Sequence, residues 1–218
     1  MLKETKKEEE SASAVPAWAR EFHGHACPFM PIGYRMGVLA MKELGIEREK
    51  DHGMFALSEM GEGHPNTCMN DGIQAATGCT FGKLLMERLN YGKFAFVLYK
   101  KGKEAVRVSI KPDFVDIIGK HEFSTMRKNG REASEIPSDI AKSVIEIVLK
   151  AEDSDMFKVE RLADFTFERP PARFNKGKCS KCGEYVFERY LRIVDGKPVC
   201  IPCSDYIESR LNFPQRLT

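Results

Sequence analysis

Hydrophobic and polar positions follow two periods along the chain. In residues 32–44 apolar side chains recur at helical spacing, and Gly45 then supplies a residue that commonly ends helices. Residues 94–99 form a continuous apolar run that predicts a buried strand, and residues 106–110 alternate apolar and polar side chains as in a half-buried strand. Helical and extended segments therefore share one chain.

Weaker patterns complete the expected elements. They predict helices over residues 17–22, 69–77 and 138–151, strands over 55–60 and 157–167, and one short helix within 112–126. Ser138 is expected to cap the helix that begins there. The set predicts an α+β fold in which helices accompany a mixed or antiparallel sheet.

Composition divides the chain into three parts. Residues 1–14 are rich in Lys, Glu, Ser and Ala and predict a disordered tail. Two consecutive prolines make residues 168–172 the best linker, because proline disfavours both helix and strand pairing. We therefore expect an α+β domain over residues 15–168 and a small domain over residues 169–218.

The charges argue against two classes of partner. The 218 residues hold 34 Lys and Arg against 32 Asp and Glu, a net charge of +2, which does not favour a general binder of nucleic acid or membrane surfaces. The last 50 residues carry +5, but they show no basic stripe with interleaved aromatic residues, so nucleic acid is not expected as a partner. No apolar run reaches the 18 or so residues of a membrane span. The charged first ten residues do not match a secretory signal, so the expected compartment is the cytoplasm.

The small domain has the cysteine spacing of a structural zinc site. Cys179 and Cys182 form one C-x2-C pair, and Cys200 and Cys203 form another after 17 intervening residues. A unit of about 40 residues cannot bury enough apolar surface to fold alone, so a metal is physically needed. Four thiolates favour zinc, or less often iron, while a redox-active dithiol pair is the alternative. We expect a closed structural site in a zinc-ribbon-like domain.

A second group of metal-capable side chains lies in the larger domain. His23, His25 and Cys27 fall within five positions, and Cys68 and Asp71 stand one helical turn apart further along. Cys79 is a further possible ligand. These residues can hold a second metal, expected to be zinc, or the cysteines can simply be small buried apolar residues. If the metal has an open position, Asp71 or His25 can act as a general base, or can orient a metal ligand through a hydrogen bond.

Long ordered motifs in this domain resemble the FmdE family, which takes its name from a component of formylmethanofuran dehydrogenase. The motifs are FHGHACP at residues 22–28, IGYR at 32–35, NDGIQ at 70–74, TGCTFGK at 77–83 and NYGK at 90–93. The resemblance implies an α+β core, an intertwined homodimer, and a metal held near His23, His25, Cys27 and Cys68, with Asp71 and Cys79 close by. Many family members also end in a zinc finger.

The chain departs from the family pattern at one position. Family members usually have Gly after the Cys-Pro pair, whereas this chain has Phe29, which can narrow the entrance of a pocket. Among other polar residues, His64 can line that pocket, add a ligand or be merely exposed. Lys83 and Arg35 can neutralise an anionic ligand, and His52 and His121 are expected on the surface.

Three functions remain open at this point. The resemblance implies a metal-binding accessory or metal-site subunit of anaerobic one-carbon metabolism, associated with formylmethanofuran dehydrogenase or another molybdenum or tungsten enzyme. A stand-alone zinc-dependent enzyme would use a pocket formed by His23, Cys27 and Cys68. A regulatory or binding protein would instead contact a partner protein or nucleic acid through the zinc ribbon.

Overall fold

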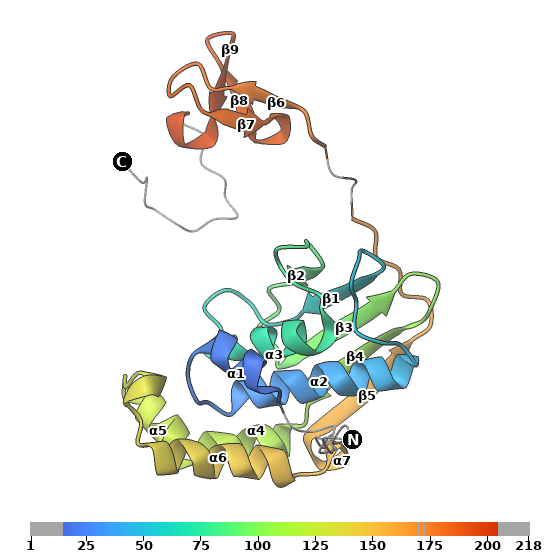
Figure 1. The fold of residues 1–218 in the computed structure, drawn as a ribbon, viewed down its shortest axis with the longest axis vertical. Helices are drawn as coiled ribbons and strands as arrows, with labels where there is room; N and C mark the ends of the chain where they lie inside the picture. Colours follow the sequence, from blue (N-terminus) through green and yellow to red (C-terminus); the bar gives the residue numbers. More distant parts are fainter. Residues whose placement is uncertain (1–14, 170, 172, 205–218) are drawn as a thin grey trace, which may run out of the picture. The chain divides into compact units, whose positions relative to one another are not determined.

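The described residues of the computed structural model fall into two compact units (Figure 1). The structure describes residues 15–169, 171 and 173–204, and the division between the units lies after Phe167. Across these residues, no helix combines the length and the apolar character that a bilayer crossing requires. Each of the two units has its own buried core.

A mixed sheet forms the centre of the first unit, as the sequence predicts. Within the described residues its five strands lie in the order β2-β1-β3-β4-β5, with β2 parallel to β1 and the other neighbours antiparallel. The strands are β1 (Met54–Ser58), β2 (Met86–Arg88), β3 (Ala95–Lys100), β4 (Ala105–Ile110) and β5 (Phe157–Leu162). The fold is α+β.

Both faces of the central strand β3 are buried, which explains its continuous apolar run. Phe96 and Leu98 point into the main core, where helices pack on the sheet. Val97 and Tyr99 point to the opposite face, where Phe165 covers them after the chain leaves β5. Because successive side chains of a strand alternate between faces, burial on both faces removes the polar half of the pattern.

Helices cover the main-core face of the sheet. Figure 1 shows α2 and α3 lying side by side across the strands, while α4, α5 and α6 form a second group. The helices and 3-10 turns are α1 (Ala17–His23), α2 (Phe29–Leu44), α3 (Cys68–Thr77), α4 (Pro112–Lys120), α5 (Glu122–Lys128), η1 (Ala133–Glu135), α6 (Ser138–Lys150) and α7 (Asp153–Met156). The second group packs on α2 through α6.

Glycines bring α2 and α3 into direct backbone contact. A Cβ atom on Gly33 would lie 2.0 Å from the carbonyl oxygen of Met69, and one on Gly72 would lie 2.2 Å from that of Met30. No real Cβ atom tolerates such distances, so both positions require glycine. This contact fixes the start of α3 against the start of α2.

Several sequence predictions need correction in this unit. Residues 112–126 form parts of two helices, because His121 interrupts them and its Nδ1 accepts a hydrogen bond from the amide of Phe123. The same ring lies 3.2 Å from Ser143, so His121 is a capping residue that also joins α5 to α6. Ser138 is not a cap, since it is the first residue of α6 after Pro137. Strand β5 ends at Leu162, and β2 was not predicted because three residues are too few for a pattern.

Two basic residues considered for anion binding have structural roles. Arg35 is buried and donates to the carbonyl oxygens of Val148 and Ala151 and to the carboxylate of Asp153, so it holds the end of α6 to α2. These carbonyls are the ones that a helix end leaves without partners. Lys83 donates to backbone carbonyls in the loop before β1.

The second unit consists of two hairpins. Its elements are β6 (Lys176–Lys178), β7 (Tyr185–Phe187), η2 (Glu188–Tyr190), β8 (Leu191–Val194), β9 (Lys197–Cys200) and η3 (Ile201–Cys203). β6 pairs with β7, and β8 pairs with β9, both antiparallel. Among the described residues, its buried apolar core consists of Cys179, Val199 and Cys200, with a few partly buried side chains around them. So small a core supports the need for a metal.

The helix contact predicts the effect of adding one methyl group. Gly72→Ala should destabilise the protein by at least about 2 kcal/mol, because the clash outweighs the roughly 1 kcal/mol that alanine gains in helix propensity. Gly119→Ala in α4 is the matched control, since a Cβ there meets nothing within 4 Å. Urea unfolding measures both. Equal stability of the two variants would contradict a tight α2–α3 contact.

A buried carboxylate anchors the loop before β1. Glu49 accepts hydrogen bonds from Lys100 Nζ at 2.7 Å and from the amides of Lys50 and Asp51. The hydrogen bond from Lys100 is the largest cause that lowers the pKa of Glu49 below its usual value, while burial opposes it.

This shift predicts a pH-dependent contribution to stability. A carboxyl group with a lowered folded-state pKa stabilises the protein above its unfolded pKa and loses this effect as the pH falls through the folded value. Glu49→Gln should therefore destabilise the protein by about 1–2 kcal/mol at pH 7. The difference from wild type in the free energy of unfolding should shrink as the pH is lowered towards 3. A constant difference would assign the effect to packing instead of charge.

Candidate metal centre

Four predicted ligands converge where α1, α2 and α3 meet. His23 ends α1, His25 and Cys27 lie in the connection to α2, and Cys68 opens α3. One donor atom from each of these residues lies within 4.8 Å of all the others. The glycine contact between α2 and α3 produces this convergence, because it holds the chain near Cys27 against the start of α3.

The distances within this His2Cys2 cluster suit a tetrahedral ion. Cys27 Sγ lies 3.5 Å from His23 Nε2, and Cys68 Sγ lies 3.9 Å from His25 Nε2. Zinc bonds of about 2.0 Å to nitrogen and 2.3 Å to sulfur place tetrahedral donors roughly 3.5–3.8 Å apart. The imidazoles and thiolates of the cluster therefore fit zinc in both donor type and spacing.

Asp71 orients one of the imidazoles. Its Oδ2 lies 2.8 Å from Nδ1 of His23, and its Oδ1 accepts a hydrogen bond from Gln74 at 3.5 Å. A carboxylate on the far nitrogen leaves Nε2 free to face the cluster, and metal-binding histidines typically have such a partner. The geometry favours this positioning role over that of a general base, because Asp71 is already engaged on α3.

Contacts within the cluster shift the pKa values of its two thiols in opposite directions. The hydrogen bond to Asp71 is the largest cause that raises the pKa of His23, to about 9. Cys68 accepts a hydrogen bond from Cys27 and interacts with His23, and these contacts lower the pKa of its thiol to about 4. The same contact with Cys68, together with burial, raises the pKa of Cys27. Cys68 is therefore the thiol that ionises first.

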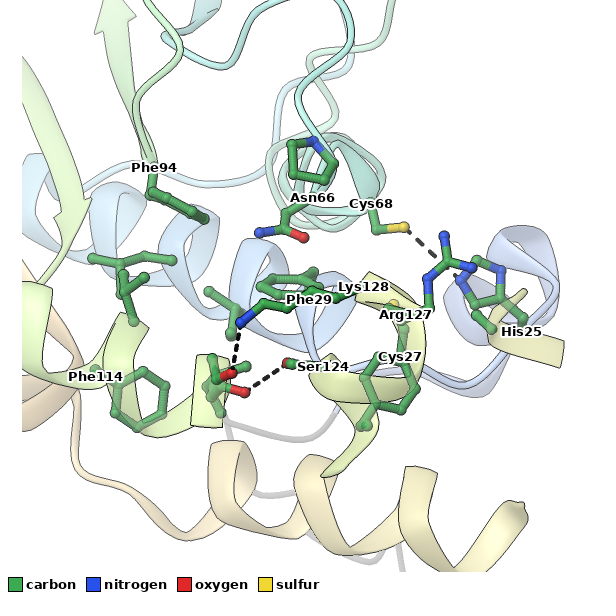
Figure 2. A pocket seen from close by; sticks show the side chains of 18 of the residues that line it. His25, Cys27, Phe29, Asn66, Cys68, Phe94, Phe114, Ser124, Arg127 and Lys128 are labelled. Atoms are coloured by element: carbon green, nitrogen blue, oxygen red, sulfur yellow. Dashed lines mark hydrogen bonds between the residues drawn. The ribbon is translucent and has the colours of Figure 1, made fainter. Parts of the chain in front are cut away.

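A cavity of about 510 Å³ opens beside the cluster. Three of the four candidate ligands line it, namely His25, Cys27 and Cys68. Figure 2 shows His25 and Arg127 at one end, Phe94 and Phe114 at the other, and Phe29 between them. The volume falls within the usual range of small-molecule sites, which are mostly apolar with a few polar groups.

Most of the cavity wall could not be found from the sequence. Phe29 is half-buried and lines the pocket. Asn66, Phe114, Ser124 and Arg127 also line it, although no motif singled them out. They come from the loop before α3 and from α4 and α5, which only the tertiary fold brings to the cluster.

Two further candidates lie outside the four-residue cluster. Cys79 is buried and its thiol donates to the carbonyl oxygen of Met54 at 3.6 Å, so it packs against the strand instead of the metal-capable group. Burial is the largest cause that raises its pKa, to about 11. The ring of His64 packs edge-on against Phe94 at 4.8 Å, and its Nδ1 accepts from the amide of Asn66. His64 thus supports a residue of the pocket without lining it.

One polar residue of α3 was also missed. Asn70 is 3 % exposed, and neither polar atom of its carboxamide has a hydrogen-bond partner among the described residues. Buried polar groups are nearly always paired in native proteins. Asn70 does not line the cavity beside the cluster.

The four cysteines of the second unit also come together. Donor atoms of Cys179, Cys182, Cys200 and Cys203 lie within 4.8 Å of one another, and the sulfur atoms of Cys182 and Cys200 are 3.9 Å apart. The amides of Lys181 and Cys200 donate to Cys179 Sγ. Backbone hydrogen bonds are the largest causes that lower the pKa of Cys179, to about 6, which favours the thiolate form that a metal requires. This cluster is a structural metal site.

The fold and the two clusters define a class of metal-binding protein, with an α+β core carrying a His2Cys2 cluster and a second unit carrying a C4 finger. Residues 22–158 match the family described as FmdE, Molybdenum formylmethanofuran dehydrogenase operon. The chain belongs to the FmdE family. Residues 173–208 match the prokaryotic dksA/traR C4-type zinc finger.

Two relatives extend over most of the chain. A probable S-adenosyl-L-methionine-binding protein of Archaeoglobus fulgidus is 33% identical over 205 residues, which cover 85% of this chain and 51% of that protein. The chain thus spans about half the length of this curated relative. The crystal structure of an FmdE-like protein of the tungsten formylmethanofuran dehydrogenase type, from Syntrophus aciditrophicus, has a TM-score of 0.56 and 25% identity, covering 86% of this chain and 90% of that one.

The orienting role of Asp71 predicts a selective loss of metal affinity. Asp71→Asn should weaken zinc binding at the His2Cys2 cluster about 10- to 100-fold, because the amide no longer fixes the ring of His23 as a carboxylate does. Competition with a chromophoric chelator measures the affinity of each site. The C4 site is the internal control and should keep its affinity. A uniform loss at both sites would indicate general unfolding instead.

Proposed function

We propose that this protein binds a zinc-class ion in its His2Cys2 cluster and presents that ion to a small molecule held in the adjacent cavity. The observation that carries the proposal is the meeting of a complete donor set with a 510 Å³ pocket. A purely structural site, such as the C4 cluster, needs no such cavity beside its ligands. The first unit then carries the proposed binding of the ion and the small molecule.

The residues of the pocket indicate what it would hold. Phe29, Phe94 and Phe114 offer apolar surfaces that suit the body of a ligand, and Asn66 supplies a polar group between them and the cluster. Arg127 also lines the cavity, with one guanidinium nitrogen hydrogen-bonded to Glu132. A molecule with an apolar body and a polar end directed to the cluster fits this arrangement. A zinc ion held by the four donors would supply Lewis acidity to a donor atom of that polar end if this atom joined the ion as a fifth ligand.

We further propose an accessory or metal-site role in anaerobic one-carbon metabolism, alongside a molybdenum or tungsten enzyme. Membership of the FmdE family and the likeness to the Syntrophus protein support this role. The chain's own two clusters hold metal donors, so assembly, metal delivery or association fits them better than redox chemistry. The match to the Archaeoglobus protein leaves nearly half of that protein uncovered, so S-adenosyl-L-methionine is not part of the proposed function.

A stand-alone zinc-dependent enzyme is the second candidate function. The observation that favours it is that His25, Cys27 and Cys68 face the cavity directly, so a ligand can reach the cluster. In this case Asp71 positions His23. His25 is then the remaining candidate for transferring a proton, which requires its imidazole to leave the ion. Turnover of a substrate by the metal-loaded chain, without partner proteins, would distinguish the enzyme from the accessory protein.

We also propose a cytoplasmic homodimer. The exposed rings of Trp18 and Phe22, with exposed fractions of 51% and 72%, stand one turn apart on α1 and give a second copy an apolar surface to bury. All seven cysteines are free thiols in the described residues, which suits a reducing compartment.

Metal content tests the proposed function. Wild-type protein should hold close to two zinc ions per chain by elemental analysis, because each cluster supplies four donors. The Cys27→Ser/Cys68→Ser variant should hold one ion and keep the fold of the second unit. Cys179→Ser is the matched variant in the C4 cluster and should also lose one ion. One ion in both the wild type and the Cys27→Ser/Cys68→Ser variant would overturn the proposal.

A further inference from the structure

We propose that the second unit binds single-stranded nucleic acid on the outer face of its first hairpin. This inference concerns β6 and β7 and does not depend on the His2Cys2 cluster. The pairing of the two strands produces a surface that the linear sequence does not show, and the expectation against nucleic acid rested on that linear order.

The register places two cations and two aromatic rings on one face. Lys176 pairs with Phe187, and Lys178 pairs with Tyr185. Because side chains alternate along a strand, these four residues share a face, and all four are exposed. The opposite face carries Gly177 and Val186, which are partly buried. The surface therefore interleaves positive charge with π-systems.

Contacts within this face bring the cations and the aromatic rings close to one another. The ammonium groups of Lys176 and Lys178 lie 5.3 and 5.2 Å from the centre of the Tyr185 ring. Tyr185 and Phe187 still have exposed fractions of 65% and 46%, so much of each ring is open to a partner. Directly after β7, Arg189 lies 5.1 Å from the ring of Tyr190 and adds a second aromatic–cation pair next to the hairpin.

Charge and ring geometry together select the occupant. A net charge of +5 over the last 50 residues favours a polyanion. Exposed aromatic rings beside cations suit unpaired bases, which stack on the rings while phosphates contact the lysines. A duplex hides its base faces, so it would use only the charges. The combination therefore favours a single strand over a duplex.

Fluorescence anisotropy of the full-length, metal-loaded protein with labelled oligouridylate of 12 nucleotides tests this inference. Tyr185→Ala and Phe187→Ala should each weaken binding about tenfold, because each removes a stacking platform. Tyr185→Phe keeps the ring and should retain most of the affinity. Ile193→Ala, which changes an exposed apolar residue of β8, is the matched control and should bind as wild type.

The salt dependence tests the lysines separately. Lys176→Ala/Lys178→Ala should reduce the slope of log K against log salt concentration by about 1.4, which corresponds to two phosphate contacts with a single strand. Lys197→Ala, which removes one positive charge from β9 outside the β6–β7 hairpin, is the control and should leave the slope unchanged. Unchanged metal content in every variant establishes that the fold is retained.

Three outcomes would overturn the inference. The first is no binding of the oligouridylate at 50 mM salt. The second is binding that the ring variants do not change. The third is displacement by inorganic polyphosphate as effective, per phosphate, as displacement by unlabelled oligouridylate, because charge alone would then account for binding. The Cys27→Ser/Cys68→Ser variant should bind the oligouridylate normally, so failure of the proposed function and failure of this inference are distinguishable.

Discussion

The close backbone contact of α2 and α3 is the constraint on which the first unit depends. Gly33 and Gly72 allow each helix to approach the other to a distance that any side chain would prevent. The contact lies near the N-terminal ends of both helices, and those ends carry the thiols of Cys27 and Cys68. A packing feature of the core therefore sets the spacing of the metal donors, and stability and site geometry cannot be changed independently here.

The same arrangement gives the cluster its electrostatic character. The N-terminal end of a helix carries a partial positive charge and unpaired amide groups, which stabilise nearby thiolates. Two such ends converge with the His23 imidazole, whose pKa Asp71 raises. The chain thus stabilises negative charge on the sulfur of Cys68, whose pKa is lowered, before any ion arrives. The cavity beside the His2Cys2 cluster distinguishes it in character from the C4 cluster. The second unit contains only enough apolar surface to surround its own cysteines.

The sequence predicted the parts of this molecule that local pattern determines. The α+β class, the mixed sheet and both groups of clustered donors followed from periodicity, spacing and motif resemblance. The break at His121 was missed because its cause, a capping bond and a contact to Ser143, is not a periodic feature. Cys79 was considered a possible ligand because it is a cysteine within the TGCTFGK motif, yet its thiol donates a hydrogen bond to the carbonyl oxygen of Met54 in the core. Walls of the cavity and the aromatic–cation face depend on which segments become neighbours, and single-sequence patterns do not contain this information.

The placement of the ligands also bears on the order in which the protein matures during synthesis. His25 and Cys68 are 43 positions apart, and each thiol of the first cluster lies at the start of a different helix. A nascent chain that has exposed only His23, His25 and Cys27 offers an incomplete donor set, and α2 has no glycine-bearing partner to pack against. Capture of an ion at full affinity by the proposed site must therefore wait until α3 has left the ribosome and packed on α2, so that ion binding reports on this helix contact.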